Sequence, residues 1–165
     1  MWCMMAAPLI AGNILISMTE QTKSILTHKG LIAIDQDPMG IQAVRTQVFG
    51  AATNFTDVYG DPLTRWEQEV WAKPLLLHPG DYQQYGFALA FVNHGNASIK
   101  IEATMAAVAK VFPQYYDSTA KMDSLELWTN QGAGDVAGEA AVIDWVTSPS
   151  GVAVIHLDPD CEENT

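Results

Sequence analysis

Positive charge is scarce in this sequence. Only 8 lysines and arginines stand against 19 aspartates and glutamates, so the formal charge is −11 at pH 7. Phosphate groups of nucleic acids and the surfaces of anionic membranes bind positively charged patches. The charge balance therefore argues against a nucleic acid or a membrane as the partner of this chain.

Cysteine is equally scarce. The chain has two, Cys3 near its start and Cys161 in an acidic tail, and neither belongs to a CxxC pair or a Cys/His cluster. A structural zinc site needs about four such ligands at short spacings. We therefore expect no metal and no cofactor, and the spacing favours two free thiols over a Cys3–Cys161 bridge.

Long apolar runs are also missing. Residues 1–18 are apolar, but Pro8 and Asn13 interrupt them and no positively charged region precedes them. A secretory signal needs that charged region, and a membrane span needs about 20 apolar residues. The stretch is therefore interpreted as structural. With 48% hydrophobic residues in 165, the chain has enough apolar mass for one packed domain and part of another.

The first 40 residues read as a strand, a helix and a turn. Ala6–Ala11 is continuously apolar, as in a strand buried on both faces. Thr19 is a good helix cap, and the helix is expected to end near His28 and Lys29, with Gly30 after it. A short apolar run, Leu31–Ile34, then leads to a turn at Gln36–Gly40.

These residues resemble a known family. The matching positions are Ala6, Ala7, Pro8, Leu9, Gly12 and Asn13, followed by Ile32, Ala33, Ile34, Gln36, Asp37, Pro38 and Gly40. In order and spacing they are similar to glycoside hydrolase family 27, which contains α-galactosidases and α-N-acetylgalactosaminidases. There the first motif is the last strand of a (β/α)8 catalytic barrel, and the second leads into the C-terminal domain.

The resemblance implies two parts. Residues 1–44 would be the remnant of the TIM barrel, its last strand and helix, and residues 45–165 a linker followed by an antiparallel β-sandwich. One departure lies in Ile14-Leu15-Ile16, where the family has Asp-Leu-Arg. Apolar side chains thus replace a carboxylate and a cation at the mouth of the barrel.

The rest of the chain fits the sandwich. Arg45–Asp61 is polar and small, and is expected to be a linker or long loop. The strand-like runs after it are Val70–Leu77, Phe87–Val92, Ile99–Thr104, Leu125–Trp128, Val142–Val146 and Val152–Leu157. Gly/Pro/Asn turns separate them, which is typical of a mainly β sandwich. The second and third runs predict a hairpin, and Ala103–Val111 could instead form a helical turn.

No catalytic residue is assigned. Retaining glycosidases use two carboxyl groups about 5 Å apart. In the resembled family these are aspartates on earlier barrel strands, which have no counterpart here. Asp35 and Asp37 could be read as a metal-binding pair or an acid/base pair. The favoured interpretation is a simple turn that starts at Asp37-Pro38.

Other residue types are weaker candidates. Four tryptophans could stack on sugars, although strand tryptophans are more often core residues: Trp66, Trp71, Trp128 and Trp145. The histidines are scattered without ligand spacing: His28, His78, His94 and His156. Asn54 and Asn96 begin N-glycosylation sequons, both in expected loops.

Three functions follow. By resemblance, the chain is part of an α-galactosidase-like hydrolase that removes terminal α-D-galactosides with retention. It lacks the catalytic aspartates and is expected to be inactive alone. The alternatives are a stand-alone carbohydrate-binding module and a truncated relic without function. In the family, the full-length enzyme binds an α-galactoside and is secreted, lysosomal or vacuolar. Galactose and N-acetylgalactosamine specificity are left open.

Overall fold

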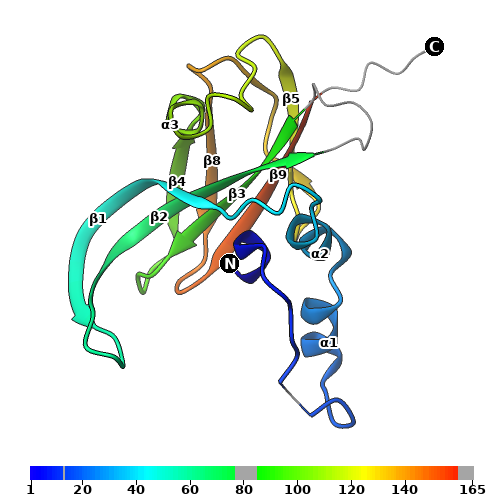
Figure 1. The fold of residues 1–165 in the computed structure, drawn as a ribbon, viewed down its shortest axis with the longest axis vertical. Coiled ribbons are helices and arrows are strands. Elements are labelled where there is room, and N and C mark those ends of the chain that lie inside the picture. The colour runs from blue at the N-terminus through cyan, green and yellow to red at the C-terminus, as the bar shows by residue number, and fades with distance from the viewer. Residues whose placement is uncertain (13, 77–84, 160–165) are drawn as a thin grey trace.

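The protein is an antiparallel β-sandwich with short N-terminal helices, as Figure 1 shows for the computed structural model. The structure describes residues 1–12, 14–76 and 85–159. The helices are η1 (a 3-10 helix, Trp2–Met5), α1 (Glu20–Leu26), α2 (Lys29–Asp35) and α3 (Met105–Val111). The strands are β1 (Val44–Thr56), β2 (Pro62–Leu76), β3 (Tyr85–Asn93), β4 (Ile99–Thr104), β5 (Lys121–Glu126), β6 (Gln131–Gly132), β7 (Val136–Ala137), β8 (Val142–Thr147) and β9 (Val152–Pro159).

Two sheets form the sandwich. The larger has the order β1-β2-β3-β9-β5-β6, with β7 also paired to β5, and the smaller is β4-β8. Every pairing is antiparallel. The smaller sheet and α3 cover one face of the larger sheet, whereas η1 and α2 cover the other (Figure 1).

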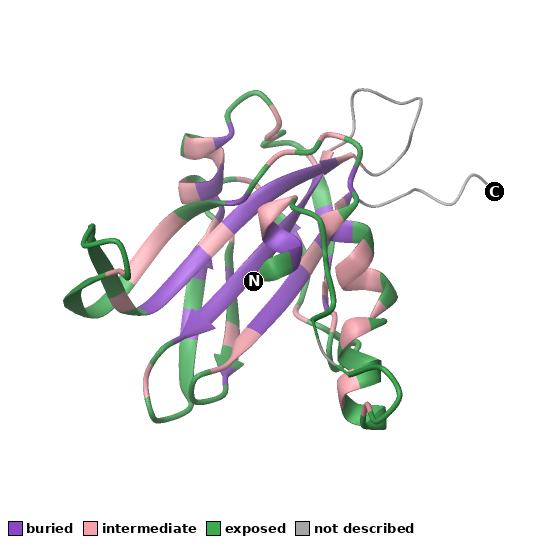
Figure 2. Cartoon of the chain, turned by 60° about the horizontal axis from the view of Figure 1, so that its bottom comes forward, coloured by how far each residue is buried: buried purple, intermediate pink, exposed green. Residues whose placement is uncertain are grey.

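Strand β3 shows how the sequence produces this layering. Successive side chains of a strand point to opposite faces. Phe87, Leu89 and Phe91 lie in the core under the smaller sheet and α3, while Ala88 and Ala90 lie under η1 and α2. Both faces are buried, which explains why this strand is apolar at nearly every position rather than at alternate ones. Figure 2 shows the central strands as the most buried part of the molecule.

The predicted β-sandwich is confirmed, but the predicted N-terminal strand is wrong. Ala6–Ala11 forms no strand, and Ala6 itself adopts a left-handed backbone, with φ 46°. The segment has no neighbouring strand among the described residues, so the hydrogen bonds that define a strand are not made. The described part contains no helix that is long and apolar enough to cross a membrane.

The helical region differs from its prediction in one respect. Thr19 caps α1 as expected, and its side chain accepts a hydrogen bond from the Thr22 amide at 3.1 Å. His28 does not end that helix but caps the next one, accepting from the Leu31 amide at 3.4 Å. The run Leu31–Ile34 therefore lies within α2, and Gly30 is a helical residue packed against Leu127.

Two further predictions are corrected downstream, and one alternative is decided. Arg45–Asp61 is no linker, since most of it forms β1, which is joined to β2 by a turn at Asp57–Asp61. β3 and β4 form no hairpin, because β4 crosses to the other sheet and pairs with β8. The alanine-rich Ala103–Val111 mostly forms α3, in line with the helical alternative.

Candidate functional site

Large apolar side chains are exposed around the first residues of the chain. We call this surface the N-terminal face and define it by the exposed side chains Trp2, Leu9, Ile10, Ile14, Leu15, Ile16, Ile25 and Trp128. Ile10 is 84% exposed and Ile16 fully so. A cavity of about 320 Å³ connects Trp2, Leu9, Ile10, Ile25 and Trp128. Large exposed apolar patches of soluble proteins mark interaction surfaces.

Buried contacts fix this face to the sandwich. Cys3, Met4 and Ile34 pack on Leu75, Ala88, Ala90 and Val154 of the larger sheet. The Ala43 amide donates to the Met4 carbonyl at 2.8 Å. Burial raises the pKa of the Cys3 thiol, which makes it a weak nucleophile. Cys161 lies outside the described residues, and the prediction that Cys3 and Cys161 are free thiols is therefore not tested.

A buried lysine joins the helices to the sheet. Lys73 of β2 is completely buried, and its ammonium donates to the Ile34 carbonyl at 2.7 Å. That carbonyl lies in the last turn of α2, where helix carbonyls lack helical partners and the helix dipole favours a cation. Burial lowers the pKa of Lys73, while nearby Asp37 and Asp35 act in the opposite direction.

The two candidate aspartates have different surroundings. Asp37 is buried, and its carboxylate accepts from the Met39 amide at 3.1 Å and the Leu76 amide at 2.8 Å. It therefore closes the expected turn and ties it to β2. Asp35 is the last residue of α2 instead, and its Oδ1 has no hydrogen-bond partner. Across the residues that the structure describes, no cluster of three or more His, Cys, Asp or Glu could hold a metal ion.

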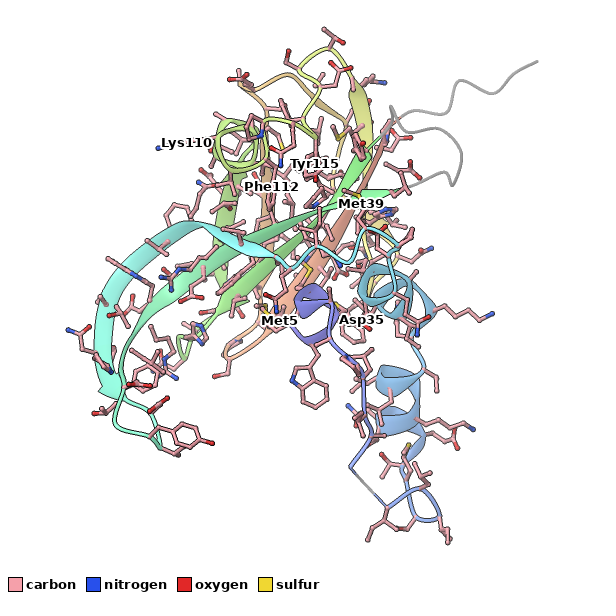
Figure 3. All side chains as sticks on the ribbon, viewed as in Figure 1. Met5, Asp35, Met39, Lys110, Phe112 and Tyr115 are labelled. Atoms are coloured by element: carbon pink, nitrogen blue, oxygen red, sulfur yellow. The ribbon has the colours of Figure 1, made fainter. Side chains whose placement is uncertain are left out.

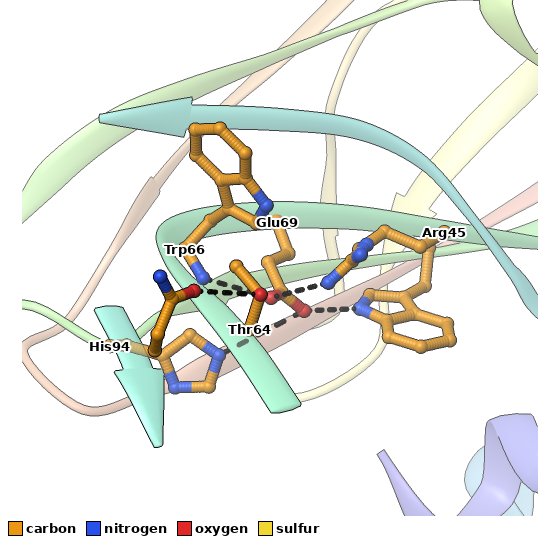
Figure 4. A network of polar contacts seen from close by, with 7 residues as sticks. Arg45, Thr64, Trp66, Glu69 and His94 are labelled. Atoms are coloured by element: carbon orange, nitrogen blue, oxygen red, sulfur yellow. Dashed lines mark hydrogen bonds and ion pairs between the residues drawn. The ribbon is translucent and has the colours of Figure 1, made fainter. Parts of the chain in front are cut away.

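A second buried carboxylate was missed by sequence reasoning. Glu69 of β2 accepts from Arg45 Nη1 at 3.1 Å, from the Trp66 amide at 3.3 Å and from Trp71 Nε1 at 2.9 Å, and its Oε2 lies 3.9 Å from His94 Nε2 (Figure 4). This Glu69 network joins β1, β2 and the segment after β3. Its one sequence signal is a carboxylate that directly precedes the apolar residues Val70-Trp71-Ala72, because a buried charge needs partners.

The tryptophans do not form one surface. Trp71 packs with the N-terminal cluster, whereas Trp145 packs against the core from the smaller sheet on the other side. Trp66 is also half-buried. Trp128 is 42% exposed and meets the ring of His28 edge-on, with the centroids 5.1 Å apart.

The histidines also stay apart. His28 caps α2 and pairs its Nε2 with the Leu127 carbonyl at 2.9 Å. His94 belongs to the Glu69 network. His156 lies on β9, where burial lowers its pKa and Asp158 partly opposes this. His78 lies outside the described residues.

The two sequons have different structures. Asn96 lies exposed in the loop between β3 and β4, as predicted. The loop prediction is wrong for Asn54, which lies within β1. Its Oδ1 accepts a hydrogen bond from Thr64 Oγ1 of the adjacent strand at 2.8 Å.

Comparison with known proteins gives a consistent result. No family model matches the chain. It is 31% identical over 159 residues to α-galactosidase A of Cellvibrio japonicus, covering 96% of this chain and 34% of that protein. It is 28% identical over 159 residues to α-galactosidase 5 of Saccharomyces cerevisiae, covering 92% of this chain and 29% of that protein.

Solved structures share the fold. α-Galactosidase I of Mortierella vinacea matches with a TM-score of 0.71 at 22% identity, over 94% of this chain and 33% of the other. A family 27 β-L-arabinopyranosidase of Geobacillus stearothermophilus matches with a TM-score of 0.67 at 15% identity, over 99% of this chain and 29% of the other. The chain thus spans about a third of the length of its relatives. Its motifs, its β-sandwich and these similarities support an α-galactosidase-like fragment of the glycoside hydrolase family 27 type.

Proposed function

We propose that this chain is the C-terminal portion of an α-galactosidase, which hydrolyses terminal α-D-galactosides with retention, and that the chain has no hydrolase activity by itself. Residues 1–44 complete the catalytic barrel and residues 45–165 form the sandwich that supports it. The observation that carries this proposal is the N-terminal face, which exposes large apolar side chains over a cavity of about 320 Å³.

The distribution of exposed apolar residues supports a barrel as the covering partner. Ile10, Ile14 and Ile16 are largely exposed, although their segment leads through α1 to α2, which packs on the sandwich through Ile34. Each such side chain contributes about 1.5–3 kcal/mol when it is fully buried. Relatives that are about three times as long carry additional protein, and the barrel expected from the family motifs would cover this segment.

The surroundings of two buried carboxylates support the second part of the proposal. Asp37 is buried and engaged by two backbone amides, which suits a structural role. Glu69 is surrounded by an arginine and two tryptophans, with all its contacts inside the sandwich. A retaining mechanism needs a nucleophile and an acid/base on either side of one sugar, and neither side chain is free for such a role.

The test is the rate of hydrolysis of a chromogenic α-galactoside by the purified chain. The expected rate equals that of a sample prepared in parallel from host cells without the gene. A rate above that background that falls when Asp35→Asn or Asp37→Asn is introduced would contradict the proposal. A rate that both variants retain, and that separates from the chain on a sizing column, identifies a contaminating enzyme.

The N-terminal face can be tested separately with an apolar dye such as ANS, which binds exposed hydrophobic surface. The double substitution Ile14→Ser/Ile16→Ser is expected to reduce dye fluorescence clearly. The matched control is Val142→Ser/Val146→Ser, because those valines of β8 are 52% and 62% exposed but lie on the smaller sheet. Equal effects of the two pairs would show that the N-terminal face is not a special surface.

One observation favours a second candidate, a carbohydrate-binding module. Trp128 is 42% exposed beside the apolar cavity, where its ring could stack on a sugar. Titration with galactosides would quench tryptophan fluorescence if this were the function, and Trp128→Ala would abolish the quenching. Unchanged fluorescence at millimolar sugar would argue against a binding module and favour the proposal that the chain is a portion of an α-galactosidase.

A further inference from the structure

The sequence contains two sequons that cannot be ranked by pattern alone, and the structure separates them. Asn54-Phe55-Thr56 lies in β1, in register with β2 at Asn54–Thr64, Phe55–Leu63 and Thr56–Pro62. Asn96-Ala97-Ser98 lies in a loop, with all three residues exposed. We propose that Asn96 is an N-glycan acceptor and that Asn54 is not. This inference is independent of the proposed hydrolase.

Backbone geometry is the first argument. A sequon is modified while it is bent into a turn, which brings the serine or threonine hydroxyl near the asparagine amide. Residues in a strand ladder are extended and hydrogen-bonded, whereas a surface loop is free to bend. Asn54 also uses its Oδ1 to accept from Thr64 Oγ1 at 2.8 Å, and bending would break this contact.

The way the Asn96 loop is held is the second argument. Asn93, which is 1% exposed, donates from Nδ2 to the carbonyls of Ala97, Thr147 and Ser148 at 2.8, 3.2 and 3.1 Å. Its Oδ1 accepts from the Gly95 amide at 2.9 Å. These hydrogen bonds hold the base of the loop, whereas Asn96 itself is exposed to solvent.

Folding order during synthesis is the third argument. β1 and β2 are consecutive antiparallel neighbours, so the Asn54 sequon, although exposed, is held in the ladder with Pro62–Thr64 once β2 has been made, and β3 then pairs with the rest of β2. Three strands with an apolar face are the smallest independently stable sheet. β4, which follows Asn96, pairs only with β8 in the described part of the chain, and Asn93 also needs Thr147 and Ser148. These lie about 50 residues after Asn96, which gives roughly 3–10 s at the usual rate of synthesis.

The chemistry is a glycosyl transfer. The nucleophile is Nδ2 of Asn96, and the donor is an oligosaccharide on a lipid pyrophosphate in the lumen of the endoplasmic reticulum. The bond between the sugar C1 and the phosphate oxygen breaks, and a C1–N bond forms. The amide gives one proton to a base of the transferase, and the lipid pyrophosphate leaves with the electron pair.

The test is translation of the full chain, preceded by a cleavable signal peptide, in the presence of microsomes. The expected product carries one glycan, seen as a single mobility shift that endoglycosidase H removes. Asn96→Gln and Ser98→Ala should each abolish the shift, because one removes the acceptor and the other the hydroxyl. Asn54→Gln and Thr56→Ala are the matched controls and should leave it intact.

Three results would overturn the proposal. They are the absence of any shift, a shift that Asn54→Gln removes while Asn96→Gln retains it, and a product with two glycans. Misfolding of a variant does not confuse these outcomes, because Ser98→Ala leaves the acceptor asparagine in place. Agreement of Ser98→Ala with Asn96→Gln therefore assigns the shift to this sequon.

Discussion

Replacing Lys73 by methionine would test how the N-terminal helices are held on the sandwich. The side chain of Lys73 is fully buried, and its ammonium lies 2.7 Å from the Ile34 carbonyl at the end of α2. Methionine preserves the length of the side chain but removes the donor and the charge. Figure 3 labels Met5 of η1 and Asp35 of α2, two helices that contact each other.

The magnitude follows from three effects. Loss of a hydrogen bond to a charged group costs about 1.5–3 kcal/mol, and the Ile34 carbonyl is left without this donor. Loss of the cation also removes compensation for Asp35, whose buried Oδ1 has no hydrogen-bond partner. In the opposite direction, methionine avoids the desolvation that lowers the pKa of Lys73. Asp37 retains its two backbone amides in either case. The expected net loss is about 1–3 kcal/mol of unfolding free energy.

The assay is equilibrium unfolding in urea, followed by tryptophan fluorescence, together with hydrogen exchange of the α2 amides. Lys73→Met should lower the urea midpoint of unfolding. It should also speed the hydrogen exchange of the α2 amides, relative to the natural protein, more than that of the β3 amides. Lys100→Met is the matched control, since Lys100 is half-exposed and its pairing with Asp144 at 2.6 Å is at the surface. Such surface pairs contribute little to the free energy of unfolding. A Lys73→Met protein as stable as the control variant would refute the reasoning.

Three further outcomes are expected. Glu69→Leu should cost about 1–3 kcal/mol in urea unfolding, because Trp71 Nε1 loses its acceptor; an unchanged midpoint would contradict the Glu69 network. Gly50 has φ +76°, and a Cβ added there would lie 2.8 Å from the Glu67 Cβ. Gly50→Ala should therefore lower the melting temperature. A melting temperature equal to or above that of the natural protein would count against this. The pKa of His156 is lowered in the folded state, so its neutral form is favoured; the stability it provides is present above the unfolded pKa of about 6.5 and is lost as pH falls through the folded pKa. Between pH 7.5 and 5, His156→Gln should therefore lose less unfolding free energy than the natural protein, whereas equal losses would exclude this role.

The sandwich could be predicted from the sequence because its central strands have a clear apolar pattern. β3 is apolar at nearly every position since both of its faces are buried, and β4 and β8 were located almost to the residue. β1 was missed because its side chains are largely exposed, so that neither alternation nor an apolar run marks it, and Gly50 suggested a loop.

The remaining differences arise from contacts between distant residues. Ala6–Ala11 has the composition of a buried strand, but a strand also needs neighbours, and none is present in the described structure. The Glu69 network joins residues as far apart as Arg45 and His94, which no local pattern reveals. The same applies to Lys73, whose partner Ile34 lies 39 positions away.

The most direct test of the central claim is the size of the native protein. An antibody against the sandwich would be used on extract of the source cells, and the band would be identified by peptide mass spectrometry. The account predicts a band well above 18.0 kDa that also yields peptides preceding Met1, including those of a catalytic barrel. A single band at 18.0 kDa without such peptides would contradict it, because the N-terminal face would then have no barrel to cover it.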